Sequence, residues 1–178
     1  MVLGFLKRLF GGSSMKALDA GARAPRFTLK DAQGKSYSLG EVLKDGPVLL
    51  AFFKVSCPVC QFTLPFLERL HQGVKESGRA RVWGISQNDA SETREFAREY
   101  RLSFPLLLDE EGYPVSNNYG LTNVPTLFLV KPSGSIQVST IGFARADVEE
   151  TAREFGRTTD RSIQVFLPGE AIPDYKPG

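Results

Sequence analysis

The sequence predicts an α/β fold with a central mixed β-sheet flanked by helices. Apolar stretches of strand length alternate along the chain with stretches of helical periodicity, the pattern of a sheet covered by helices. The pattern ends in two strands joined by a short turn, so both parallel and antiparallel pairs are expected. At 178 residues, the chain is long enough for one domain with a sizeable core. We expect this domain over residues 17–157, between a segment 1–16 and an extended tail 158–178.

The predicted strands begin with a β-hairpin. Apolar residues alternate on both sides of residues 32–35, which have the composition of a turn. The run "PVLLAFFK" (47–54) predicts a central strand buried on both faces, because it is apolar without alternation. The remaining strands are expected at 81–86, 104–109, 126–130 and 135–141, with a turn at 131–134.

The predicted helices lie at 58–77, 91–101, 113–120 and 145–155. The first helix contains Pro65, which must remove one backbone hydrogen bond and produce a kink. Its buried stripe is expected to comprise Val59, Phe62, Phe66, Leu67 and Leu70. The second helix is expected to begin with Ser91 as its N-cap.

The composition excludes several classes of function. The net charge of +2 comes from 22 basic and 20 acidic residues spread along the chain, so no nucleic-acid partner is expected. The start "MVLGFLKRLFGGSSMK" carries its charges inside the apolar run, unlike a secretory signal, and is too short to span a membrane. We expect residues 1–16 to be flexible or amphipathic, with at most weak membrane-surface contact through 1–10. A cytoplasmic location is therefore expected.

The two cysteines, Cys57 and Cys60, stand where a buried strand leads directly into a helix. Pro58 suits the first helical turn, where its missing N–H is no loss. Cys57 then lies at the helix N-terminus, where free N–H groups and the helix dipole favour a thiolate. Cys60, one turn further along, is expected to be more buried and able to attack a mixed disulfide at Cys57.

Three interpretations of this pair compete. A zinc site needs four ligands, and the lone histidine, His71, is too far along the same helix to join the cysteines. We expect no metal and no cofactor, and expect His71 to be exposed near the helix end. An incidental pair in the core is the second interpretation. A redox couple is favoured, because a strand–CxxC–helix arrangement in an α/β pattern is a specific signal.

From about Ala20 to Phe155 the sequence resembles the thioredoxin-like redoxins of the AhpC/TSA-redoxin superfamily, and more closely the TlpA-like thiol–disulfide oxidoreductases. The resemblance rests on the predicted hairpin, on "CPVC" followed by a proline within the helix, and on "VPT" before a strand. It implies a thioredoxin-like fold with the hairpin as an N-terminal extension. It also implies that Pro125 is cis and faces the cysteines, and that the backbone of Val124 pairs with an extended substrate. An ordinary edge or turn proline is the alternative.

The sequence departs from the family at positions near the cysteines. Thioredoxins carry a buried acid where this chain has Ala51, and many TlpA-like proteins carry a glutamate where it has Thr63. The usual tryptophan before the first cysteine is Ser56. The proton acceptor for Cys60 is therefore unidentified. Lys54 is the nearest charged residue in sequence and a candidate for tuning the acidity of the nucleophile, although a lysine at a strand end more often points to solvent.

Peroxiredoxins share this fold, and a thiol-dependent peroxidase is the main alternative function. Their motif is Pro-x-x-x-Thr-x-x-Cys; aligned on Cys60, this chain has Phe53 and Cys57 at the proline and threonine positions. Both groups that shape the peroxide pocket are missing. A redox-sensing interaction domain is a further alternative.

The expected function is reduction of disulfides, with Cys57 as nucleophile and Cys60 as resolving cysteine. The expected partners are a disulfide-containing protein or a small thiol substrate, and an electron donor that the sequence does not identify. Redox potentials of such cysteine pairs span roughly −270 to −120 mV, and the intervening Pro-Val gives no value for this pair. The reducing direction is therefore expected from the cytoplasmic location.

Overall fold

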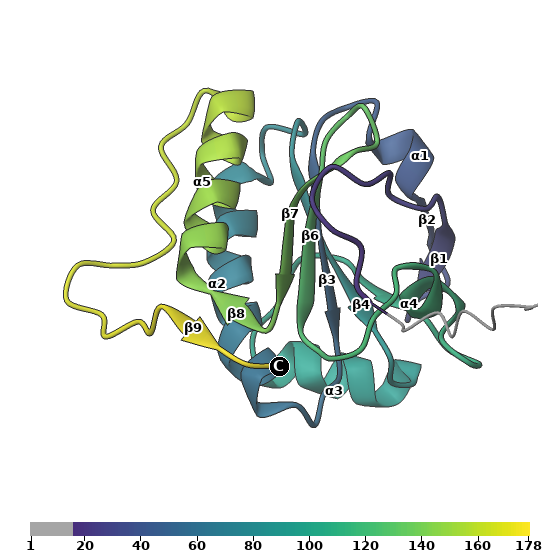
Figure 1. Cartoon of the computed structure of the whole chain (residues 1–178). Coiled ribbons are helices and arrows are strands. Elements are labelled where there is room, and N and C mark those ends of the chain that lie inside the picture. Colours follow the sequence, from purple (N-terminus) through teal and green to yellow (C-terminus); the bar gives the residue numbers. More distant parts are fainter. Residues whose placement is uncertain (1–15) are drawn as a thin grey trace, which may run out of the picture.

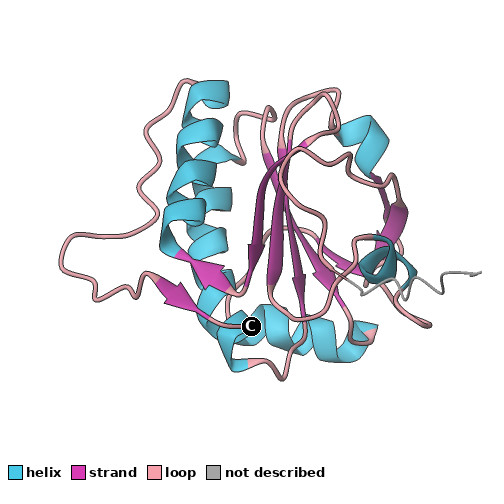
Figure 2. Ribbon diagram, viewed as in Figure 1, coloured by secondary structure: helices cyan, strands magenta, loops and turns pink. Residues whose placement is uncertain are grey.

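The computed structural model describes residues 16–178, so the expectations for residues 1–15 fall outside the described part of the chain. The described residues form a seven-stranded mixed sheet with helices on both faces and a two-stranded ladder beside it (Figures 1 and 2). This is the α/β architecture that the sequence predicts. Within the described range, no helix has both the length and the apolar character needed to cross a membrane.

The large sheet has the strand order β2-β1-β5-β4-β3-β6-β7. The three central strands β5, β4 and β3 run parallel to one another. At one side of them β6 pairs antiparallel with β3 and β7 with β6, and at the other side β1 pairs antiparallel with β5 and β2 with β1. The strands are β1 Thr28–Asp31, β2 Ser36–Ser38, β3 Val48–Phe53, β4 Arg81–Ser86, β5 Leu106–Leu108, β6 Thr126–Val130, β7 Ile136–Ile141, β8 Phe143–Ala144 and β9 Tyr175–Lys176.

The helices divide between the two faces of this sheet. Helices α2, α3 and α5 pack into one core and α1 and α4 into the other. In Figure 1, α2 and α5 lie together on one side of the sheet and α1 and α4 on the opposite side. The helices are α1 Leu39–Val42, α2 Pro58–Val74, α3 Ala90–Glu99, α4 Pro114–Asn118 and α5 Arg145–Thr159.

Strand β3 is central because its apolar run serves both cores. Every residue of β3 is buried. Leu49 and Phe53 belong to the core beneath α2 and α5, whereas Leu50 and Phe52 belong to the opposite core. Successive side chains of a strand point to opposite faces, so an apolar run without alternation fits a strand covered on both sides. The prediction for this strand is confirmed.

The N-terminal hairpin is also confirmed. Strands β1 and β2 pair antiparallel, with Thr28 opposite Ser38. Their turn is closed by the Gly34 N–H, which donates to the Asp31 carbonyl at 3.0 Å. Strand β1 also pairs with β5, so the hairpin extends the sheet at one edge.

Several predicted helix boundaries are wrong. Helix α3 begins at Ala90, and its N-cap is Asp89, whose Oδ1 accepts a hydrogen bond from the Glu92 N–H at 2.8 Å. Ser91, the predicted cap, already lies inside the helix, since the extended backbone that an N-cap requires occurs at Asp89. Helix α2 ends at Val74 rather than near residue 77, and α5 continues to Thr159, beyond the predicted end at 155.

The predicted buried stripe of α2 is only partly correct. Leu67 and Leu70 are fully buried, but Val59, Phe62 and Phe66 are partly exposed. The stripe lies on a neighbouring flank of the helix, where the fully buried residues are Cys60, Thr63, Leu64, Leu67, Leu70 and Val74. Phe62 and Phe66 instead contact Phe143 and Phe166, at ring-centroid distances of 5.1 Å and 5.2 Å.

His71 is half-buried, so its predicted exposure is wrong. Its ring lies 6.0 Å from that of Phe104, a core residue that precedes β5. Burial lowers the pKa of His71, although the nearby Glu68 carboxylate acts in the opposite direction.

Candidate active site

Cys57 is the N-cap of helix α2. Strand β3 ends at Phe53, and the Cys57 N–H turns back to the Lys54 carbonyl at 3.2 Å. The Cys60 N–H donates to the Cys57 sulfur at 3.2 Å, and the Gln61 N–H donates to the Cys57 carbonyl at 3.0 Å. These hydrogen bonds fix the Cys57 sulfur at the first turn of α2, as the sequence predicts.

The loop between β3 and α2 is held by two side-chain hydrogen bonds. The Val55 N–H donates to Asn88 Oδ1 at 3.0 Å, and Gln61 Nε2 donates to the Val55 carbonyl at 2.9 Å. Asn88 was not predicted as a site residue from the sequence. Its only sequence signal is its position just after strand β4, whose carboxyl end lies beside that of β3 in the parallel pair.

The two cysteines differ in environment. Cys57 is partly exposed, whereas Cys60 is fully buried, as predicted. Burial raises the pKa of the Cys60 thiol, and its hydrogen bond with Cys57 raises it further. At neutral pH Cys60 is therefore a thiol rather than a thiolate.

The peptide bond between Val124 and Pro125 is cis, and it lies against the cysteines. The Cys57 thiol donates to the Val124 carbonyl at 3.3 Å. The Gly142 N–H donates to the Pro125 carbonyl at 2.7 Å, and the Thr126 hydroxyl donates to the Asn123 carbonyl at 2.8 Å, so this loop is braced from both sides. The structure thus brings Cys57, Val124 and Pro125 together; their roles in substrate binding stay predictions.

Lys54 is exposed, and its Nζ lies 5.7 Å from the centre of the Tyr113 ring. This cation–π contact directs the ammonium group toward the start of α4. A role of Lys54 in tuning Cys57 stays a prediction.

The positions that carry acids in the family hold neutral groups in contact with the backbone or the core. Ala51 is fully buried in strand β3, and the hydroxyl of the buried Thr63 donates to the Val59 carbonyl at 2.7 Å. In the described part of the chain, no carboxylate is among the groups that shift the pKa of Cys60. Over the same range, no cluster of three or more histidine, cysteine, aspartate or glutamate residues could hold a metal ion.

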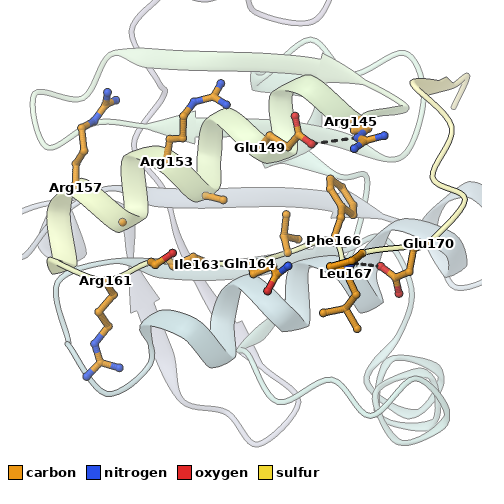
Figure 3. A pocket seen from close by; sticks show the side chains of 16 residues that line it. Arg145, Glu149, Arg153, Arg157, Arg161, Ile163, Gln164, Phe166, Leu167 and Glu170 are labelled. Atoms are coloured by element: carbon orange, nitrogen blue, oxygen red, sulfur yellow. Dashed lines mark hydrogen bonds and ion pairs between the residues drawn. The ribbon is translucent and has the colours of Figure 1, made fainter.

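A cavity of about 740 Å³ lies between α5 and residues 161–170, and neither cysteine lines it (Figure 3). Arginine side chains project from its rim. Arg145 pairs with Glu149 at 3.1 Å, and Arg153 pairs with Glu150 at 2.7 Å. Because acids of the same helix already compensate these two charges, this cavity is a weaker candidate for a functional site than the cysteines.

Comparisons with known proteins agree with this geometry. The model of the AhpC/TSA family matches residues 20–139, which include both cysteines and the cis-proline. Thiol-disulfide oxidoreductase ResA of Halalkalibacterium halodurans is 35% identical over 133 residues, 74% of each chain. Thioredoxin-like protein YneN of Bacillus subtilis is 30% identical over 127 residues, 70% of this chain and 73% of its own.

Solved structures give the same result. The thioredoxin domain of a thiol-disulfide oxidoreductase from Bacteroides vulgatus is 25% identical, with a TM-score of 0.67, and the match covers 78% of this chain and 99% of that one. A putative thiol:disulfide interchange protein DsbE from Chlorobium tepidum has a TM-score of 0.69 at 24% identity, covering 80% of this chain and 99% of that one. The thioredoxin-like fold is thereby confirmed.

Proposed function

The chain belongs to the AhpC/TSA family and is a thiol–disulfide oxidoreductase, and we propose that it reduces protein disulfides through Cys57 and Cys60. The observation that carries this proposal is the position of the Cys57 sulfur. It is partly exposed, accepts the Cys60 N–H at 3.2 Å and lies 3.3 Å from the Val124 carbonyl beside the cis bond. A nucleophile and a backbone docking position therefore adjoin at one point of the surface.

The first step is attack by the Cys57 thiolate on a partner disulfide. One partner sulfur becomes bonded to Cys57 in a mixed disulfide, and the other leaves as a thiolate. The N–H of Cys60 stabilises the attacking thiolate because it already donates to that sulfur. The partner lies extended beside Val124 and Pro125 and pairs with the Val124 backbone by strand addition.

The second step is attack by Cys60 on the Cys57 sulfur of the mixed disulfide. Cys60 must first lose its proton, and burial disfavours that loss. A disulfide between Cys57 and Cys60 then forms, and the second partner sulfur leaves as a thiolate. Two electrons have passed to the partner, and an external dithiol donor restores the reduced pair.

Trapping of the mixed disulfide tests this order of events. The Cys60→Ser chain is first reduced, freed of reductant and mixed with insulin; it should then accumulate an adduct at Cys57, detected by mass spectrometry without reduction. Insulin reduction is measured in a separate assay with dithiothreitol as the donor. Cys57→Ser is the matched control and should form no adduct and lose insulin reduction. Absence of an adduct, together with unchanged insulin reduction by Cys57→Ser, would contradict the proposal. Peroxide consumption that needs Cys60 but survives Cys57→Ser would indicate a peroxidase instead.

The reducing direction is part of the proposal. A measured potential near the oxidant end of the range, about −120 mV, would reverse this direction, whereas one near −270 mV would support it.

A further inference from the structure

The C-terminal tail returns to the candidate active site from the far side of the molecule. After α5 ends at Thr159, the chain passes outside α5 and comes back to β8 (Figure 1, yellow). This path follows a region that the family model does not match, since the match ends at residue 139.

The middle of the tail is fixed to helix α2. Arg69 donates two hydrogen bonds of 2.8 Å to the Glu170 carboxylate and a third, of 3.0 Å, to the Val165 carbonyl. Phe166 packs against Phe66 and Phe143, at ring-centroid distances of 5.2 Å and 6.1 Å. The tail is thus anchored to α2 at Arg69 and Phe66, further along the helix than the cysteines.

Beyond this anchor, the tail forms a short strand beside the site. Strand β9 pairs antiparallel with β8, and the Arg145 N–H donates to the Asp174 carbonyl at 2.9 Å. The Lys176 Nζ lies 5.0 Å from the centre of the Phe62 ring. Phe62 comes two residues after Cys60, so the tail covers the flank of α2 next to the redox pair.

The last described residues touch the backbone of the cis-proline loop. A Cβ at Gly178 would stand 2.8 Å from the Val124 carbonyl oxygen, and a Cβ at Gly142 would stand 2.2 Å from the Lys176 carbonyl oxygen. Contacts this close leave no room for a further chain between tail and loop. Asn123 Nδ2 also donates to the Gly178 carbonyl at 3.2 Å. The tail therefore adjoins the same carbonyl that accepts the Cys57 thiol.

We propose that residues 174–178 are an internal cover of the substrate-docking edge, and that this cover determines which disulfides the protein accepts. The segment occupies the position beside Val124 that an extended partner needs. The covered state then admits a small disulfide to the partly exposed Cys57 sulfur but admits a protein segment only after residues 174–178 move away. This proposal rests on the proposed function, because it names the edge used by the substrate of that reaction.

Residues 174–178 are held weakly enough to be displaced by a partner. Its strand has only two residues, and Tyr175 is 55% exposed, so little apolar surface holds it in place. The ion pair between Arg69 and Glu170 lies upstream of residue 174 and can keep the rest of the tail attached while the cover opens. An incoming strand would replace the backbone contacts that the cover gives up.

Alkylation of Cys57 measures this cover without any catalytic turnover. The reagents are iodoacetamide and an extended decapeptide that carries the same iodoacetyl group, both applied to the Cys60→Ser chain. Deletion of residues 174–178 should raise the rate with the decapeptide about tenfold if the cover is closed about nine-tenths of the time. The rate with iodoacetamide should change by less than about twofold, because a small reagent already reaches the sulfur.

A point variant controls for loss of the native fold caused by the deletion. Gly178→Val should raise the decapeptide rate in the same direction, because its side chain must push away from the Val124 carbonyl. Gly40→Ala is the matched control: its Cβ meets only ordinary contacts with Arg26, and neither rate should change. Thermal unfolding of each variant shows whether the fold is kept.

Equal effects of the deletion on both reagents, or no effect on either, would overturn the proposal. So would failure of both reagents to modify Cys57 after deletion, since an uncovered sulfur should react. These outcomes are separate from those of the trapping experiment. Size-selective alkylation without any trapped adduct would contradict the proposed function and support the cover. A trapped adduct without size-selective alkylation would support the proposed function and contradict the cover.

Discussion

Cys57 and Cys60 are two residues apart in the chain and play different parts because their surroundings differ. Cys57 is partly exposed and accepts an N–H from the first turn of α2. Cys60 is fully buried, and burial raises its pKa. Cys57 is thus open to a partner, whereas desolvation disfavours a negative charge on Cys60.

The raised pKa of Cys60 predicts a pH dependence for release of the partner. Only the Cys60 thiolate can attack the mixed disulfide, and the thiolate fraction rises about tenfold per pH unit while the pH stays below the pKa. Single-turnover release from a preformed mixed disulfide at Cys57 should therefore accelerate throughout pH 6 to 9 without a plateau. The same preparation carrying Cys60→Ser is the control and should show no release. A plateau near neutral pH would mean that an unidentified base deprotonates Cys60.

At this scale the cysteines were predictable from the sequence, and the proton path was not. The spacing of the cysteines and the strand before them are visible in the chain. The groups that shift the pKa of Cys60, besides burial, are Cys57 and the backbone of Lys54 and of Cys60 itself, and the positions of the family acids hold Ala51 and Thr63. Asn88, whose side chain accepts the Val55 N–H, was missed because it lies 33 residues further along the chain.

At the scale of elements, two nearby residues can both be suited to the N-cap position of the same helix. Asp89 and Ser91 are both good N-cap residues, and both precede the apolar positions of α3. The chain leaves its extended conformation directly after Asp89, whose carboxylate accepts the Glu92 N–H. The sequence fits either start, and the backbone of the structure uses the earlier one.

Alanine substitution should separate the two candidate caps. Asp89→Ala should lower the free energy of unfolding by about 1 kcal/mol, because it leaves a helix N–H without its partner. Ser91→Ala should change it by less than about 0.5 kcal/mol, since Ser91 is exposed and makes no cap hydrogen bond. Urea unfolding of both variants measures this difference. Equal losses would contradict the assignment of Asp89 as the cap.

Which side of helix α2 is buried is also determined by contacts between elements. A helical pattern shows that α2 has an apolar side, but Phe62 and Phe66 extend that side beyond the sheet contact. Their partners, Phe143 and Phe166, lie in β8 and the tail. The direction of the buried stripe could not be settled from the helix sequence alone, since it depends on what else covers the helix.

At the scale of the whole molecule, the tail joins α2, β8 and the cis-proline loop. Arg69 and Glu170 form the ion pair that ties it to α2. The hydrogen bonds from Arg69, followed by the Leu167 N–H, lower the pKa of Glu170 from 4.5 to about 2. A lowered pKa in the folded state means that the carboxylate stabilises the docked tail above about pH 4.5, and that this contribution disappears as the pH falls toward 2.

Removal of this charge should loosen the tail at neutral pH. Glu170→Gln should speed hydrogen–deuterium exchange in peptides from residues 161–178 while peptides from α5 stay protected. The unchanged chain should show the same selective loosening when the pH is lowered through the range 4.5 to 2. Asp19→Asn, which breaks an exposed ion pair with Lys16 elsewhere on the surface, is the matched control. Unchanged exchange in Glu170→Gln would show that the aromatic contacts alone hold the tail.

The sequence by itself determined the α/β class, the central strand, the N-terminal hairpin and the cysteine pair at a helix start. These features are local, because hydrophobic periodicity, turn residues and the spacing of two cysteines each depend only on residues close together in the sequence. Only the tertiary structure decided that residues 174–178 lie against Val124 and that no carboxylate acts on Cys60 within residues 16–178. Both depend on long-range contacts, because side chains far apart in the sequence meet only when the sheet and helices are assembled.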